Sequence, residues 1–383
     1  MPFAAAMSQH PLATHAVGEV VGEVLDQLGD APDAAVVFVT GPFAGALEDI
    51  SAAIRAMLRP DSLIGASAAS VLAGDREVES GAAISLFAMR FGPRRRFSTE
   101  PIARALRFGP QNQQGDWQVT TAEAPVDGST LILLADPFSF PVDEFVGHQA
   151  GVTVVGGLAS AAIGPHGNRL ACDGAVFDDG AVGLLLPPGV GATPVVSQGY
   201  RPVGEALVVT RSSANMIEEI AGQPALDRLL SQAEGATAED RSRMARGLHV
   251  GVVVDEHKPE FERGDFLIRP VLGADHRRRA VAVGAEIPVG STIQFQVGDA
   301  ASADEDLRAL LADVPAAAAL VFPGTGRGTA LFPYPHHDAG VVHQHLDGGA
   351  VAGMFCAGEI GPISGQHFVH AKSATMVLFD DPT

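Results

Sequence analysis

The sequence reads AVVFVTGPF at residues 35–43 and returns to a similar pattern, TLILLADPF, at 130–138. Each is a short apolar run that ends at a proline-containing pair, and such a run predicts a buried β-strand followed by a turn. A glycine-bearing apolar stretch follows each one, SLIGASAASVLAG at 62–74 and VTVVGGLASAAIG at 152–164. A looser third copy begins with AALVFPGTGRG at 318–328. Strand, helix, glycine-bearing strand and return strand therefore recur, which predicts duplication of one β-α-β-β unit.

The expected fold class is α/β, with mixed sheets layered with helices, because each unit joins a parallel crossover to an antiparallel strand pair. A run rich in Pro and Gly at 187–194 marks the boundary between two related halves, so the predicted domains are 1–195 and 196–383. Helices are expected at 14–28, 224–231, 304–311 and 338–346. The polar stretch GATAEDRSR at 235–243 is expected to be a loose loop.

The chain of 383 residues carries 45 Asp and Glu against 25 Lys and Arg, a formal net charge of −20. That charge repels nucleic acid and anionic lipid headgroups, so neither is an expected partner. The N-terminal residues 1–15 lack the basic and continuous apolar regions of a signal peptide, and no apolar stretch approaches the roughly 18 to 20 residues that span a bilayer. Cys172 and Cys356 are the only cysteines, too few for a disulfide framework. The expected location is the cytoplasm.

The first candidate binding element is PGTGRG at 323–328. Gly326 and Gly328 on either side of Arg327 would let backbone N–H groups approach an anion while the guanidinium supplies a bidentate donor. The loop lacks the Lys-Ser/Thr pair of a P-loop and the spacing of a dinucleotide fingerprint, so no cofactor is expected. The alternative is a glycine turn whose arginine is tied to a structural carboxylate.

The second element, CAGEIGP at 356–362, places Glu359 after Gly358 at the end of an apolar strand. A carboxylate in such a setting must find a partner or change its protonation, and Arg327 of the same copy is the nearest candidate. The pair could bind the two ends of a small zwitterion, or it could be a buried structural ion pair. A ligand anchor predicts that Arg327→Ala leaves the empty fold intact, whereas breaking a buried pair costs about 3 to 5 kcal/mol.

GASAA at 65–69 places Ser67 where a nucleophile elbow would, but the closing glycine is missing and no charge-relay partner is identifiable by spacing. A thiol enzyme built on Cys356 with His370 has no better support. Small residues in such strands let a helix or a ligand approach closely. Ser67 is therefore expected to contribute to the ligand site and not to react.

Histidines gather in the C-terminal part of the chain, at positions 336, 337, 343, 345, 367 and 370. His343 and His345 would diverge on the expected helix, so no metal site is predicted. Removal of divalent metals is accordingly expected to leave the melting temperature unchanged. A metal-assisted hydrolase or lyase using these histidines remains an alternative.

By the order and spacing of its segments the chain resembles the FIST family, whose N-terminal and C-terminal domains occur in bacterial sensory and signal-transduction proteins and in an F-box protein. The N-terminal pattern matches AVVFVT and SLIGASAASVLAG, and the C-terminal one matches FLIRPVLGAD, IPVGSTIQFQVGDA, EDLRALL, ALVFPGTGRG and AGMFCAGEIGP. The resemblance implies a sensory module for a small ligand, with amino acids as the ligand class and no catalytic mechanism. Two departures are Gly324, where relatives often carry Cys, and Gly298, where they usually carry Arg. The resemblance therefore implies neither a thiol role at position 324 nor an ion pair at position 298.

The sequence therefore predicts a non-enzymatic module that binds a small polar ligand in a cleft between the halves and acts on a separately encoded signalling protein. The predicted ligand-binding residues are Arg327, Gly326, Gly328, Glu359, Gly358 and Ser67. The prediction leans away from catalysis but leaves enzymatic activity open. The alternatives are the metal-assisted hydrolase or lyase and a ligand-free protein-interaction scaffold.

Overall fold

A computed structural model describes residues 2–91, 101–111, 117–119 and 126–381. These residues form two compact units. The first unit comprises 1–196, 310–362 and 367–383, and the second comprises 197–309 and 363–366. The predicted domains 1–195 and 196–383 stay a prediction, because compact units are defined by contacts within the chain and not by independent folding.

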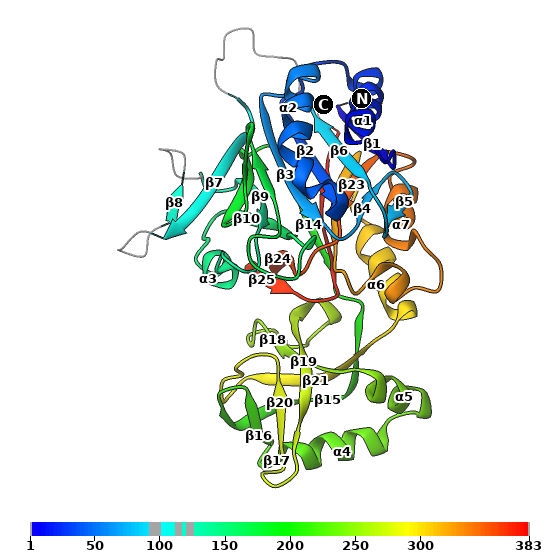
Figure 1. The fold of residues 1–383 in the computed structure, drawn as a ribbon. Coiled ribbons are helices and arrows are strands. Elements are labelled where there is room, and N and C mark those ends of the chain that lie inside the picture. Colours follow the sequence, from blue (N-terminus) through cyan, green and yellow to red (C-terminus); the bar gives the residue numbers. More distant parts are fainter. Residues whose placement is uncertain (1, 92–100, 112–116, 120–125, 382–383) are drawn as a thin grey trace. The chain divides into compact units, whose positions relative to one another are not determined.

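The first unit contains the recurring β-α-β-β pattern in three copies (Figure 1). The first copy consists of β1 (Phe3–Ser8), α1 (Ala13–Leu28), β2 (Ala34–Thr40), η1 (Gly41–Ala46), α2 (Leu47–Met57), β3 (Ser62–Ala68), β4 (Val71–Ala73), β5 (Arg76–Val78) and β6 (Ile84–Met89). The second consists of β7 (Arg104–Gln111), β8 (Trp117–Val119), β9 (Thr130–Ala135), α3 (Val142–Gly147), β10 (Thr153–Leu158), β11 (Leu170–Cys172), β12 (Ala175–Phe177) and β13 (Ala181–Leu186). The third consists of β14 (Ala192–Ser197), β22 (Ala318–Pro323), η3 (Gly328–Ala330), α7 (His337–His345), β23 (Ala350–Met354), β24 (Glu359–Ile363), β25 (Gln366–His370) and β26 (Ala374–Phe379). The helix α6 (Ala300–Leu311) precedes β22, and most of it belongs to the second unit. The predicted duplication and the mixed α/β class are confirmed.

Each copy contributes the central strands of one sheet and a hairpin at the edge of another. The three sheets have the orders β1-β6-β2-β3-β11-β12, β25-β24-β10-β9-β13-β7-β8 and β14-β26-β22-β23-β4-β5. Hairpin β4–β5 of the first copy thus joins the sheet of the third, β11–β12 joins the sheet of the first, and β24–β25 joins the sheet of the second. This cyclic exchange places residues of different copies side by side at the sheet edges.

A glycine at the same register in each copy allows the two parallel strands to approach closely. Gly65, Gly156 and Gly353 pair with Val37, Leu133 and Val321, respectively. A Cβ on each glycine would lie within 2.5 Å of the carbonyl oxygen of its partner, and only 1.8 Å from it at Gly353. The glycines that repeat along the sequence are therefore a steric requirement of the strand pair.

The three sheets share one hydrophobic core, which contains Phe38, Leu134 and Phe322 from the first parallel strand of each copy. The rings of Phe38 and Phe322 meet edge to face at 6.0 Å. Helices cover outer faces: α1 and α2 pack on the first sheet, and α3 packs on the second. Inner core and outer helices form the layers that the sequence predicts.

The segments that follow β3, β10 and β23 are hydrogen-bonded to one another, and we call them the strand-end junction (67–70, 158–160 and 355–358). Ser160 N donates to the Ser67 carbonyl, Phe355 N to the Ser70 carbonyl, and Ala357 N to the Leu158 carbonyl. The Ser160 hydroxyl also donates to the Phe355 carbonyl and accepts a hydrogen bond from Ala69 N. The carboxyl ends of parallel strands from all three copies therefore meet, and ligand sites of α/β sheets are common at such ends.

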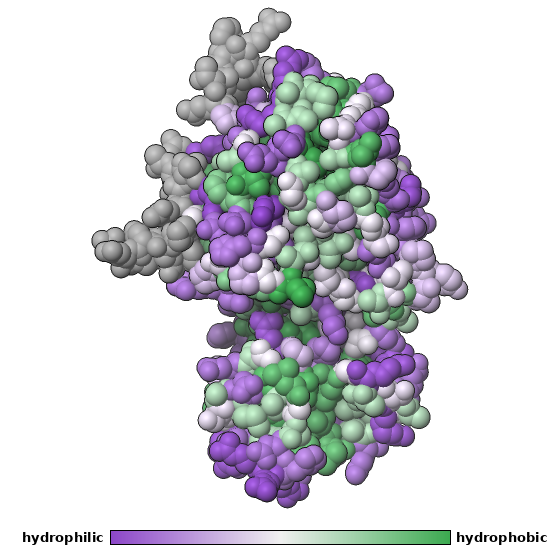
Figure 2. Space-filling view, viewed as in Figure 1, coloured by the Kyte–Doolittle hydropathy of each residue, from purple (hydrophilic) through white to green (hydrophobic). Residues whose placement is uncertain are grey.

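The second unit is a closed antiparallel barrel with the helices α4 and α5 and most of α6. Its elements are β15 (Tyr200–Ser213), β16 (Met216–Ile220), β17 (Gln223–Pro224), α4 (Ala225–Gly235), α5 (Ala238–Arg246), β18 (Leu248–Val253), η2 (Arg263–Asp265), β19 (Phe266–Asp275), β20 (Ala280–Val283) and β21 (Thr292–Gly298). The strand order is β15-β21-β18-β19-β20-β16-β17, and an added pairing of β15 with β16 closes the ring. In the space-filling view, hydrophobic residues gather in a band over this unit (Figure 2). Its exposed large hydrophobic residues include Leu230, Leu272 and Val289.

The helices predicted at 14–28, 224–231, 304–311 and 338–346 are confirmed as α1, α4, α6 and α7. The loose loop expected at 235–243 is wrong, because most of it forms α5. The Thr237 hydroxyl caps this helix by accepting a hydrogen bond from Asp240 N, and Arg243 bonds Glu239 and Asp299. The cap, the Arg243–Glu239 pair within the helix and the Arg243–Asp299 pair outside it stabilise a polar helix that periodicity alone does not reveal. No helix among the described residues is both long and apolar enough to cross a membrane.

Candidate functional site

The loop after β22 turns Arg327 into the protein. Gly324 pairs with Cys356 in a parallel bridge, and Thr325 N donates to the Cys356 carbonyl at 2.9 Å. Arg327 N then donates to the Gly324 carbonyl at 2.9 Å and closes a turn that leads into η3. As a result the Arg327 side chain is 0% exposed. A guanidinium removed from water in this way requires compensating charge.

Asp338, in the first turn of α7, supplies that charge. Arg327 Nε donates to Asp338 Oδ2 at 2.7 Å, and Arg327 Nη2 donates to Asp338 Oδ1 at 2.8 Å. Phe332 lies under the guanidinium, with its ring centre 5.3 Å from Arg327 Cζ. Burial alone would raise the pKa of Asp338, but the charge and hydrogen bonds of Arg327 hold that pKa well below its usual range. Asp338 is therefore ionised.

Two further carboxylates reach this loop from the first copy, because hairpin β4–β5 belongs to the third sheet. Glu77 Oε1 accepts a hydrogen bond from Ala339 N in α7 at 3.0 Å. Burial, reinforced by the charge of Asp338, raises the pKa of Glu77 to about 7. Glu79 accepts hydrogen bonds from both the backbone N–H and the hydroxyl of Thr329. The exchanged hairpin thus ties the first copy to the loop of the third.

Glu359, the first residue of β24, is the fourth carboxylate. Its Oε2 accepts hydrogen bonds from Ser373 N at 2.9 Å and from the Ser373 hydroxyl at 2.6 Å. Burial raises the pKa of Glu359 to about 8, although Ser373 and the charge of Arg327 act in the opposite direction. A Cβ at Gly324 would lie 2.3 Å from Glu359 Oε1, so the glycine makes room for the carboxylate.

The other two copies have an apolar residue where the third has Glu359. The hairpin strands β11 and β4 begin with Leu170 and Val71, respectively, and both residues are buried. A buried glutamate at this place is therefore not required by the repeated fold. We call Arg327, Asp338, Glu77, Glu79 and Glu359 the charged cluster.

Two of the predicted binding residues, Arg327 and Glu359, belong to the charged cluster, and a third, Gly328, lies next to it. Gly328 has a φ of 56°, and a Cβ on it would lie 2.9 Å from the Glu79 carboxylate. Gly326 lies beside the stem of Lys372. These placements leave ligand binding at each residue as a prediction.

The remaining predicted residues, Gly358 and Ser67, belong to the strand-end junction. The Gly358 carbonyl accepts a hydrogen bond from Leu158 N. The Ser67 side chain is fully buried, and its hydroxyl accepts a hydrogen bond from Arg169 N at 2.8 Å. Ser67 therefore helps to hold β3 to the segment before β11.

Sequence reasoning missed Asp338, Glu77 and Glu79. Asp338 is the only acidic residue in the first turn of α7, a position that suggests a partner for a preceding cation. Thr329, which bonds Glu79, lies 250 residues further along the chain, and Ala339, which bonds Glu77, lies 262 residues further; only the hairpin exchange brings the two acids here. Their sole sequence signal is a pair of acids spaced to share one strand face.

The histidines mostly bond to the backbone. His343 Nδ1 lies 3.2 Å from the Gly349 carbonyl, and His345 Nε2 lies 2.8 Å from the Val314 carbonyl. The His337 ring stacks on Phe332, and its Nδ1 lies 3.0 Å from Asp338 Oδ1. Within the described part of the chain, no three His, Cys, Asp or Glu side chains are arranged to hold a metal ion. Burial raises the pKa of Cys356 well above its usual value, so its thiol stays protonated.

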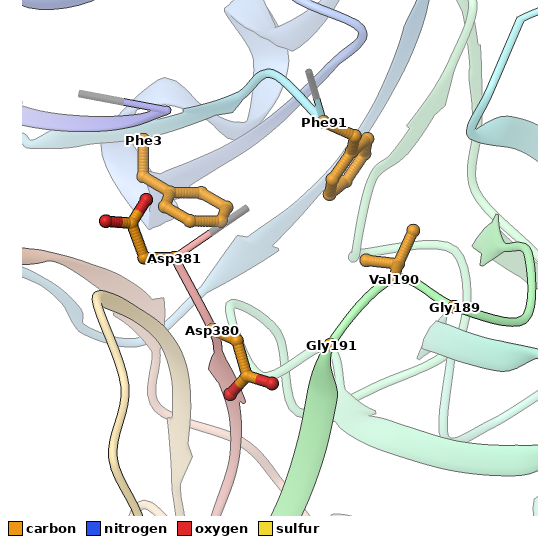
Figure 3. Close-up of a pocket in the computed structure, with 7 residues that line it drawn as sticks. All are labelled: Phe3, Phe91, Gly189, Val190, Gly191, Asp380 and Asp381. Atoms are coloured by element: carbon orange, nitrogen blue, oxygen red, sulfur yellow. The ribbon is translucent and has the colours of Figure 1, made fainter. Parts of the chain in front are cut away.

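A pocket of about 320 Å³ lies at the other end of the third sheet (Figure 3). The side chains of Phe3, Phe91 and Val190 face one another across it. Asp380 and Asp381 follow β26, which runs antiparallel to β22, so the pocket is at the end where β22 begins. Both aspartates are exposed, and water screens their charge. In the charged cluster, by contrast, Arg327, Asp338, Glu77 and Glu359 are buried.

Comparison with known proteins finds two domain families in the order that the sequence segments predict. Residues 33–223 match the FIST N domain and residues 203–362 match the FIST C domain. An uncharacterized protein of Mycobacterium bovis is 36% identical over 390 residues, which cover 97% of each chain. An uncharacterized protein of Mycobacterium tuberculosis is 35% identical over 400 residues, which cover 100% of each chain. The second match includes both the barrel and the charged loop.

Proposed function

The chain belongs to the FIST family, and we propose that it is a non-enzymatic sensory module that binds a small polar ligand at the charged cluster and acts in intracellular signalling. Amino acids are the proposed ligand class. The partner is a separately encoded signalling protein that recognises the liganded state.

The observation that carries this proposal is Glu359. Two of the three equivalent hairpins begin with an apolar residue, and only the one next to the arginine loop begins with a buried acid. A buried ionisable group weakens a fold unless it is compensated, so its presence favours a role in binding. The cluster also draws on two copies, so a ligand there would bridge hairpin β4–β5 and the loop after β22. Binding could then alter the stability of the whole unit.

A thermal-shift screen of amino acids, nucleotides and divalent metals tests the proposal. An amino acid at 100 times its dissociation constant is expected to stabilise the fold by about 2.7 kcal/mol. Glu359→Leu, which installs the residue of the second hairpin, is expected to remove this stabilisation. Glu48→Gln, on the exposed face of α2, is the matched control and is expected to behave as the wild type. If no amino acid stabilises the wild type, or if Glu359→Leu binds normally, the proposal is wrong.

A further inference from the structure

One oxygen of the charged cluster lacks a hydrogen bond. Glu77 is only 4% exposed, and its Oε1 accepts the hydrogen bond from Ala339 N. Its Oε2 is buried and has no hydrogen-bond partner among the residues that the structure describes. Buried carboxylate oxygens without a donor are rare, since each carries the full cost of desolvation.

Among the residues that the structure describes, no cation forms an ion pair with Glu77. The negative charge of Asp338 is matched by Arg327 through two hydrogen bonds. The charges of Asp338 and Glu79 both act to keep Glu77 protonated. On the other side, His336 Nδ1 accepts a hydrogen bond from Glu77 N, so that ring nitrogen is not protonated. The surroundings of Glu77 therefore favour either a bound proton or a bound cation.

A cation that binds at Glu77 Oε2 would be compact and would donate hydrogen bonds to this oxygen. A metal ion would need several converging ligands, and the described residues provide no such set. A primary ammonium group is a compact point charge with three donors. It could donate to Glu77 Oε2 and compensate the charge of the ionised Glu77 carboxylate at the same time.

Resting on the proposed function, we infer that the ligand carries a primary ammonium group, which binds the buried Glu77 Oε2. The ammonium group enters with its charge, and the carboxyl proton leaves to solvent. Binding therefore conserves the charge of the cluster. The site should accept an amine without a carboxylate and reject a carboxylate without an amine.

Isothermal titration calorimetry with three kinds of probe tests this inference. The probes are glycine and alanine, which carry both groups, methylammonium and ethanolamine, which carry only the amine, and acetate and propionate, which carry only the acid. Titrations at pH 6.5 in buffers of different ionisation enthalpy measure proton release. We expect the zwitterions and the amines to bind with proton release and the acids not to bind.

The variant Glu77→Gln keeps the acceptor for Ala339 N but removes the exchangeable charge, and we expect it to bind amines at least tenfold more weakly. Glu48→Gln is the control and should bind as the wild type does. If Glu77→Gln does not fold, the proton count and the probe selectivity of the wild type decide the question. Zwitterions that bind without proton release, while amines alone do not bind, would overturn the ammonium inference and leave the proposed function standing. A wild type that binds no probe would overturn both.

Discussion

Arg327 and Asp338 form a bidentate ion pair, with Nε to Oδ2 at 2.7 Å and Nη2 to Oδ1 at 2.8 Å, and both side chains are at most 1% exposed. The pair joins the loop after β22 to the first turn of α7. The sequence had suggested Glu359 as the carboxylate nearest to Arg327. In the structure Glu359 accepts hydrogen bonds from Ser373, and the charge of Arg327 only partly offsets the rise in the pKa of Glu359 that burial causes.

Arg327→Ala is therefore expected to lower the free energy of unfolding by about 3 to 5 kcal/mol even without ligand, because Asp338 would remain as a buried unpaired charge. Urea denaturation measures this loss. The double variant Arg327→Ala with Asp338→Ala should lose less than the sum of the two single variants. Strictly additive losses would show that the pair is not coupled.

The raised pKa of Glu359 predicts that the stability of the protein falls as the pH rises. Its pKa is near 4.5 in the unfolded chain and about 8 in the folded one, so between these values the folded state keeps a proton that the unfolded state has lost. Stability should fall as the pH rises from about 5 to about 8. Glu359→Gln has no proton to lose and should be the more stable protein at pH 8, by on the order of 3 kcal/mol. Parallel pH curves for the variant and the wild type would contradict this.

Gly353→Ala tests the close approach of the parallel strands. The Cβ of the alanine would lie 1.8 Å from the Val321 carbonyl oxygen, and moving the backbone of either strand to relieve this contact would lower the stability of the sheet. We expect a loss of about 2 to 4 kcal/mol in thermal or urea unfolding. Gly340→Ala in α7 is the control, since nothing lies within 4 Å of its added methyl group. That change should be neutral or stabilise the protein by up to about 1 kcal/mol.

The sequence predicts the repeated unit well because the pattern of strand, helix and glycine-bearing strand is local. It does not predict which sheet each hairpin joins, because that depends on contacts between distant segments. Arg327 and Glu359 of the charged cluster belong to one copy, so the sequence alone could suggest that they lie close together. Glu77 belongs to another copy and reaches the cluster only because hairpin β4–β5 joins the third sheet. The helix α5 was missed for a different reason, since its stability comes from capping and charge pairs and not from an apolar face.

The last prediction compares Ser160, which is half-buried, with Ser51, which is buried. The Ser160 hydroxyl donates to the Phe355 carbonyl of the third copy and accepts from Ala69 N of the first. Ser160→Ala would remove both hydrogen bonds, including the one to the carbonyl of the buried Phe355, so we expect it to destabilise the first unit by about 1 to 2 kcal/mol. The Ser51 hydroxyl in α2 is buried and has no partner among the described residues. Ser51→Ala removes only that unsatisfied group and adds helix propensity, so it should raise the melting temperature. If both variants are destabilised equally, the loss comes from altered packing, and the strand-end junction does not depend on Ser160.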